Sequence, residues 1–159
     1  MKKILFLITV LCFIAFSIEA KKPANLRYDI ECAGNGIKGT SLVKVWVYGN
    51  PDKITPNEIK KYAVHGVIFK GYAGNSSGCT AQKPLAQSPA LEQEKAGFFD
   101  VFFNSDKAYA KYVTEVDETT ERVKVGKEYK IGAIVSVSTE LLRKDLEAAG
   151  IIRKLSDGF

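Results

Sequence analysis

The chain has few of the residues from which metal and nucleophilic sites are usually built. Its 159 residues include one histidine, three cysteines, one methionine and one tryptophan. No CxxC or HxxxH spacing is present, so the sequence predicts neither a metal ion nor a cofactor. Pairing of His65 with Cys32 or Cys79 would give a base and a nucleophile, but nothing local in the sequence favours it. We therefore assign no catalytic residue.

Apolar runs long enough to cross a membrane are also lacking. The run from Ile4 to Phe16 holds 13 residues, where a spanning helix needs about 20. Two lysines precede this run, and the small residue Ala20 follows it, directly before a polar stretch. This order is typical of a secretory signal peptide with its cleavage site, so residues 1–20 are predicted to be one. We expect export to the bacterial periplasm or the extracellular space. A lipid anchor at Cys12 is an alternative, although Leu11 stands where a lipobox has a small residue.

Charge of one sign is not concentrated anywhere in the chain. The formal net charge is +5, and lysines and carboxylates are interspersed. Nucleic-acid binding would need a basic stripe, so no nucleic-acid partner is expected. The segment from Gly34 to Gly39 matches the dinucleotide pattern GxGxxG, but β-branched and aromatic residues follow it instead of the helix that the motif needs. We interpret this segment as a glycine-rich hairpin turn.

Two cysteines remain after removal of the signal peptide, Cys32 and Cys79. An even pair in an oxidising compartment predicts a structural disulfide. Closing a loop of this length would stabilise the fold by about 3–4 kcal/mol. Two separate thiols are the alternative.

The pattern of apolar residues predicts an α+β fold: a mainly antiparallel sheet of about five strands with three helices packed on one face. Residues 21–25 are expected to form a flexible tail, and residues 26–159 a single globular domain. The expected strands are 28–32, 41–48, 110–116, 120–125 and 128–137, and the expected helices are 56–70, 88–104 and 139–149. Residues 73–87 have no periodicity and are expected to form an irregular loop.

Several residues mark the ends of the predicted helices. Thr55 and Glu58 flank Pro56 as a capping box. Gly71 would end this helix, although a stop at His65 followed by a strand is an alternative. Ser138 or Thr139 is predicted to cap the last helix, with an apolar stripe that includes Leu141, Leu142 and Leu146. Gly150 and Ile151 are predicted to close that helix with a Schellman cap.

Four aromatic residues form the candidate binding surface: Trp46, Tyr48, Phe99 and Phe103. Trp46 and Tyr48 alternate with valines and so lie on the second face of their strand. If no helix covers that face, they would offer a platform for sugar rings or peptidoglycan fragments. If one edge of the apolar surface that contains Phe99 and Phe103 is exposed, it would form an interface with a partner protein or with a second copy of the chain. Packing in the core is the alternative for both pairs.

The sequence favours an exported, non-catalytic cell-envelope protein that binds a partner protein or a cell-wall component. One alternative is a secreted hydrolase with an acid-based site, for which Asp29 and Glu31 are the nearest carboxylate pair. Another is an exported inhibitor that uses the 73–87 loop as its contact. An enzyme would need a concave pocket with convergent polar groups.

Overall fold

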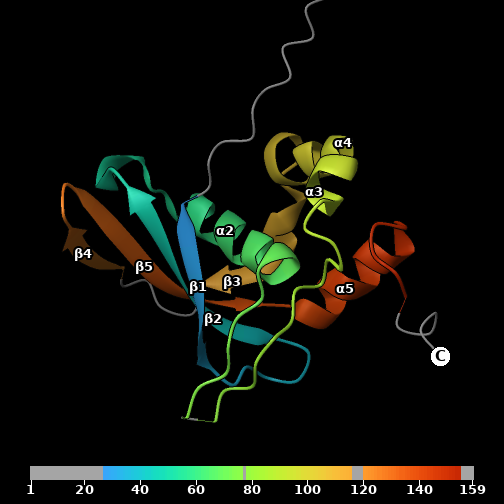
Figure 1. Cartoon of the computed structure of the whole chain (residues 1–159), viewed down its shortest axis with the longest axis horizontal. Coiled ribbons are helices and arrows are strands. Elements are labelled where there is room, and N and C mark those ends of the chain that lie inside the picture. The colour runs from blue at the N-terminus through green and yellow to red at the C-terminus, as the bar shows by residue number, and fades with distance from the viewer. Residues whose placement is uncertain (1–26, 77, 116–119, 155–159) are drawn as a thin grey trace, which may run out of the picture.

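The computed structural model describes residues 27–154, except residues 77 and 116–119 (Figure 1). The predicted signal peptide and the tail at 21–25 lie outside the described residues. Five strands form one sheet at one side of the molecule, and helices α3, α4 and α5 lie toward the other side.

The sheet is antiparallel throughout, as the sequence predicts. Its strands are β1 (Tyr28–Gly34), β2 (Ser41–Gly49), β3 (Val113–Glu115), β4 (Glu121–Val125) and β5 (Glu128–Val137). The strand order is β1-β2-β5-β3, and β4 also pairs with β5. The long β5 therefore has β2 along one edge, with β3 and β4 sharing the other edge. This confirms the predicted α+β class.

The first two strands form the predicted hairpin. Tyr28 lies opposite Val47, and Cys32 lies opposite Val43. In the glycine-rich turn the Thr40 N–H donates to the Ile37 carbonyl at 2.9 Å, and β2 begins directly afterwards. No helix follows the turn, so the interpretation as a hairpin turn is confirmed.

Helix α2 (Pro56–Phe69) is a single helix, and the alternative with a stop at His65 is wrong. The predicted capping box is present, with reciprocal 3.3 Å hydrogen bonds between Thr55 and Glu58. Gly71 follows the helix with φ +64°. A Cβ at this position would lie 2.3 Å from the Gln82 carbonyl oxygen, so both conformation and space require glycine.

The predicted helix at 88–104 is interrupted and begins later than expected. It consists of α3 (Leu91–Glu94), α4 (Ala96–Asp100) and a π-helical turn, Val101–Ser105. Ser88 accepts from the Ala90 N–H at 3.2 Å and forms a turn before the helix. The chain leaves helical geometry at Lys95, where φ is −113° and ψ is 30°. Phe98 and Phe99 then lie on α4, and Phe102 and Phe103 lie on the wider π-helical turn that follows.

The predicted strand at 110–116 is wrong in its first part. Ala108–Tyr112 is a 3-10 helix, and the strand is confined to Val113–Glu115 in the described residues. Tyr109 and Tyr112 are both buried, and their spacing of three residues matches the 3-10 repeat rather than the alternation of a strand.

Helix α5 (Thr139–Ala148) ends in the predicted Schellman cap. The Ile151 N–H donates to the Leu146 carbonyl at 2.9 Å, and the Gly150 N–H donates to the Glu147 carbonyl at 3.1 Å. Two details differ from prediction. The Ser138 side chain forms no capping hydrogen bond, and Leu141 is 46% exposed instead of joining the apolar stripe.

One apolar cluster joins the inner face of the sheet to the helices. Its members include alternate residues of β2 and β5 together with buried residues of α2 and α5: Val43, Val45, Val47, Ile131, Ala133, Val135, Ile59, Ala63, Val67, Leu142 and Leu146. Trp46 is buried but lies outside this cluster, because strand alternation directs it to the opposite face. That opposite face is called the outer face below.

Candidate functional site

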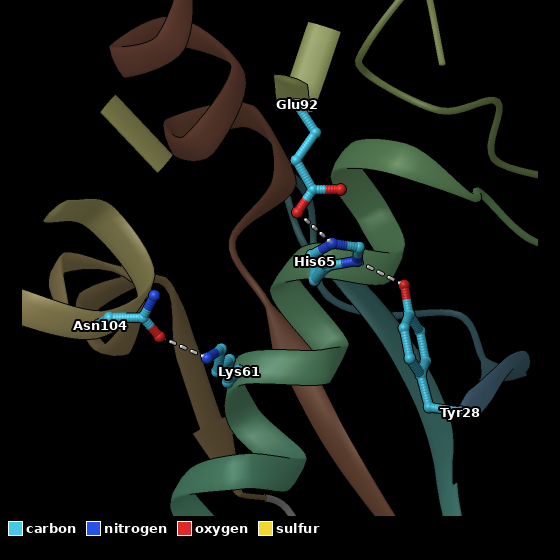
Figure 2. Close-up of polar contacts among 5 residues, drawn as sticks. All are labelled: Tyr28, Lys61, His65, Glu92 and Asn104. Atoms are coloured by element: carbon cyan, nitrogen blue, oxygen red, sulfur yellow. Dashed lines mark hydrogen bonds and ion pairs between the residues drawn. The ribbon is translucent and has the colours of Figure 1, made fainter. Parts of the chain in front are cut away.

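A chain of polar side chains centred on His65 connects three elements in the interior (Figure 2). The Tyr28 hydroxyl of β1 lies 2.6 Å from His65 Nδ1, and His65 Nε2 lies 3.0 Å from Glu92 Oε1 on α3. Tyr28 and His65 are 2% and 6% exposed. His65 is therefore a buried polar residue of α2. Its burial is possible because both ring nitrogens have partners.

The protonation of the Tyr28 hydroxyl sets the direction of the hydrogen bonds among Tyr28, His65 and Glu92. Burial, followed by the nearby charge of Glu92, raises the pKa of the Tyr28 hydroxyl. The hydroxyl therefore stays protonated and donates to Nδ1, which leaves the ring proton on Nε2 for donation to Glu92. This hydrogen bond from His65 lowers the pKa of the Glu92 carboxyl.

A substrate could not reach the hydrogen-bonded side chains of Tyr28 and His65. Tyr28 stacks on Tyr62 with ring centroids 5.1 Å apart, and His65 packs against Phe69 at 4.7 Å. Only the Glu92 side chain is substantially exposed, at 38%. Tyr28, His65 and Glu92 are hydrogen-bonded in the same order as the nucleophile, base and acid of a catalytic triad. The Tyr28 hydroxyl, however, is buried and closed off from solvent. We conclude that it holds β1, α2 and α3 together.

The lowered pKa of Glu92 predicts a loss of stability in acid. The ionised carboxylate contributes stability that is fully present above its unfolded pKa and is lost as pH falls through the lower, folded pKa. Glu92→Gln is therefore expected to cost about 1 kcal/mol at pH 7, since the carboxylate is partly exposed. Urea unfolding of both proteins between pH 7 and pH 3 measures this difference, which should shrink below about pH 4. A difference that is constant with pH would contradict this role.

A second polar contact joins α2 to the π-helical turn. Lys61 Nζ donates to Asn104 Oδ1 at 2.7 Å (Figure 2). Asn104 Nδ2 in turn donates to Asp100 Oδ1 at the same distance. Burial lowers the pKa of the Lys61 ammonium group. Phe99 on α4 and Phe103 on the π-helical turn are 3% and 5% exposed. Both are core residues, so their prediction as a binding surface is wrong.

The outer face of the sheet carries the other two predicted residues, Trp46 and Tyr48. The Trp46 indole N–H donates to Glu31 at 2.7 Å, and the ammonium groups of Lys44 and Lys130 lie 4.5 and 4.3 Å from the ring centroid. Gly132 lies against the ring, where a Cβ would come within 2.5 Å of it. Trp46 is consequently only 9% exposed. A sugar ring could stack on it only after the lysines moved.

Neighbouring side chains are held on the same face in a similar way. Tyr48 donates to Asp29 at 2.6 Å, which raises the pKa of the tyrosine hydroxyl. Lys44 also pairs with Glu121 at 2.5 Å. Asp29 and Glu31 thus each accept a hydrogen bond from an aromatic neighbour. Because both carboxylates are already hydrogen-bonded to these aromatic side chains, the structure gives no support to Asp29 and Glu31 as a catalytic pair.

A pocket of about 230 Å³ lies at the end of the sheet, beside the first turn of α5. Its lining residues are Gly39, Thr40, Ser41, Gln82, Thr139, Glu140 and Arg143. No prediction pointed to this pocket, since its residues come from three separate segments and match no motif. It has a single carboxylate, whereas a glycosidase-like site would need two.

The predicted disulfide between Cys32 and Cys79 is present, with the Cα atoms 6.3 Å apart. It attaches the 73–87 loop to β1. Within residues 27–76, 78–115 and 120–154, no cluster of three or more histidine, cysteine or acidic side chains is arranged to hold a metal ion. None of the helices in the described part of the chain is long and apolar enough to cross a membrane.

Comparison with protein-family models, curated proteins and solved structures finds no match for this chain.

Proposed function

We propose that the protein is an exported, non-catalytic cell-envelope protein that binds a partner protein through the outer face of its sheet. The observation that carries this proposal is the ordered cluster around Trp46, which lies outside the apolar core. Apolar surface that lies outside the core and is rimmed by polar residues marks protein interaction sites. Here lysines and a glutamate of the same face hold Trp46 in place.

The composition of the outer face favours a protein over a glycan. Val123 and Val125 of β4 are 40% and 44% exposed. They lie in register with Lys130 and Glu128 of β5, so apolar and charged groups alternate across the surface. Protein interfaces combine apolar contacts with a polar rim in this way. The covered indole ring of Trp46 makes sugar stacking the weaker alternative.

Export is supported by two independent features. The first 20 residues have the composition of a secretory signal peptide. The disulfide between Cys32 and Cys79 fits an oxidising compartment. An envelope location would also explain why a small domain is cross-linked between a strand and an otherwise irregular loop.

The inhibitor alternative is supported by the same loop. The Asn75 N–H donates to the Cys79 carbonyl at 3.1 Å, and the Cys79 N–H donates to Asn75 Oδ1 at 3.3 Å. These two hydrogen bonds hold Asn75 against Cys79 beside the disulfide. A contact segment that is held in place before binding loses less entropy on binding.

Site-specific photocrosslinking in cells tests the proposed surface. A photoreactive amino acid at Val123 is expected to give a discrete crosslinked protein product. The matched control is Val101, which is 45% exposed on the π-helical turn. A third probe at Thr80 tests the inhibitor alternative. Equal labelling from Val123 and Val101, or a product from Thr80 alone, would overturn the proposal that the outer face binds the partner.

A further inference from the structure

The pocket beside α5 contains Arg143, which forms a long ion pair with Glu147 but no side-chain hydrogen bond within the described residues. Arg143 is 27% exposed, and its nearest carboxylate oxygen, on Glu147, lies 3.7 Å away. That distance is too long for a hydrogen bond, and Glu147 Oε1 is buried without a hydrogen-bond partner. The guanidinium group of Arg143 makes no hydrogen bond with the part of the chain that the structure describes. A guanidinium group in this state offers several donors to a carboxylate.

The remaining lining groups are mainly acceptors. Glu140 lies one turn before Arg143 on α5, and its carboxylate packs against Gly39, where a Cβ would come within 2.9 Å of Oε2. Gly39 has φ +82°, so glycine is favoured there on both counts. The Ser41 and Thr139 hydroxyl oxygens lie 2.7 Å apart, and each has a lone pair left for a donor. Gln82 uses its amide nitrogen on the Lys83 carbonyl, which leaves its oxygen as an acceptor.

We infer that this pocket binds a small zwitterion of the amino-acid type. Arg143 would receive the carboxylate, and Glu140 with the neighbouring hydroxyl and amide oxygens would receive the ammonium group. The volume of about 230 Å³ is below the roughly 300–1,000 Å³ of pockets for drug-sized ligands. It therefore suits a molecule of a few heavy atoms. A simple anion would be repelled by the Glu140 carboxylate, and a simple amine would be repelled by the Arg143 guanidinium. Binding of either one alone is therefore disfavoured.

Two packing features keep the pocket in shape without a ligand. The Glu140 N–H donates to the Gly39 carbonyl at 3.1 Å and joins α5 to the glycine-rich turn. On the other side, the disulfide and the bridge between Tyr72 and Gln82 hold the 73–87 loop. The inference does not depend on the proposed function, because Ser41 lies on the core side of β2 and not on the outer face.

Titration followed by NMR tests the inference with the oxidised mature protein. The probes are glycine and alanine as zwitterions, with acetate and methylammonium as their separate halves. Either amino acid is expected to give saturable shifts of the Gly39, Thr40 and Thr139 amide signals, and each half should bind at least tenfold more weakly. Arg143→Gln and Glu140→Gln should each weaken amino-acid binding at least tenfold. Lys144→Gln, an exposed change on the same helix, should leave it unaltered.

Two results would overturn the inference. One is the absence of saturable shifts with either amino acid. The other is acetate binding as tight as amino-acid binding that survives Glu140→Gln, which would indicate an anion site. Amide spectra of the unliganded variants show whether each is folded, and Arg143→Lys provides a second variant that keeps the charge if Arg143→Gln is unfolded.

Discussion

Replacement of both Cys32 and Cys79 with alanine is expected to lower the free energy of unfolding by about 4 kcal/mol. The two residues are 47 positions apart, and the crosslink removes the closure entropy of that loop from the unfolded chain. Loss of the crosslink also frees the 73–87 loop, whose remaining backbone contacts to α2 are few. Leu85 and Ala86 donate to the Val67 and Ile68 carbonyls at 3.2 and 2.8 Å.

Urea unfolding of the oxidised wild type, the reduced wild type and the double variant measures this effect. The reduced wild type and the double variant should share a similar, lower midpoint. Ser76→Ala, an exposed change in the same loop, should leave the midpoint unchanged. Equal midpoints for oxidised and reduced wild type would show that the disulfide does not stabilise the fold.

Removal of the imidazole from the buried polar chain is expected to have the second large effect. His65→Leu leaves the Tyr28 hydroxyl, 2% exposed, without its acceptor and Glu92 without its donor. A buried group without a partner costs about 1–3 kcal/mol, so we expect a loss of about 3 kcal/mol. Tyr28→Phe should cost about 1–2 kcal/mol, since it leaves Nδ1 without a donor.

The double variant Tyr28→Phe/His65→Leu separates this explanation from a general packing defect. Removal of both partners leaves no orphaned hydroxyl, so the double variant should be more stable than His65→Leu alone. Tyr62→Phe is the matched control, because its ring stacks on Tyr28 but its hydroxyl forms no hydrogen bond with the described residues. Strict additivity of the two single changes in a denaturant cycle would contradict the proposed coupling.

Local sequence patterns predicted the parts of the fold that depend on neighbouring residues. The alternation of Tyr129, Ile131 and Ala133 predicted β5 with its bounds, and Thr55 with Glu58 predicted the start of α2. The spacing of the phenylalanines predicted an apolar segment but not its break at Lys95. The rings of Phe99 and Phe103 pack against Phe69 of α2 and Tyr109 of the 3-10 helix, and a helical repeat alone does not encode these contacts.

The candidate sites were predicted less well, because their residues are distant in the chain. His65 meets Tyr28 across 37 positions and Glu92 across 27. A single histidine in an apolar helix stripe gave no signal of either partner. Trp46 was placed on the correct face by alternation, but its cover of lysines depends on the pairing of β2 with β5.

The sequence by itself determined the α+β class and the hairpin nature of the glycine-rich turn, and it predicted the disulfide between Cys32 and Cys79, which the structure contains. These follow from composition, periodicity and the small number of cysteines. The export signal stays a prediction. The tertiary structure alone decided that Phe99 and Phe103 are core residues, that Trp46 is covered, and that Arg143 and Glu140 line a pocket with Ser41. The physical reason is that burial and hydrogen-bond partners depend on contacts between segments, whereas local patterns report only on the face that each residue occupies.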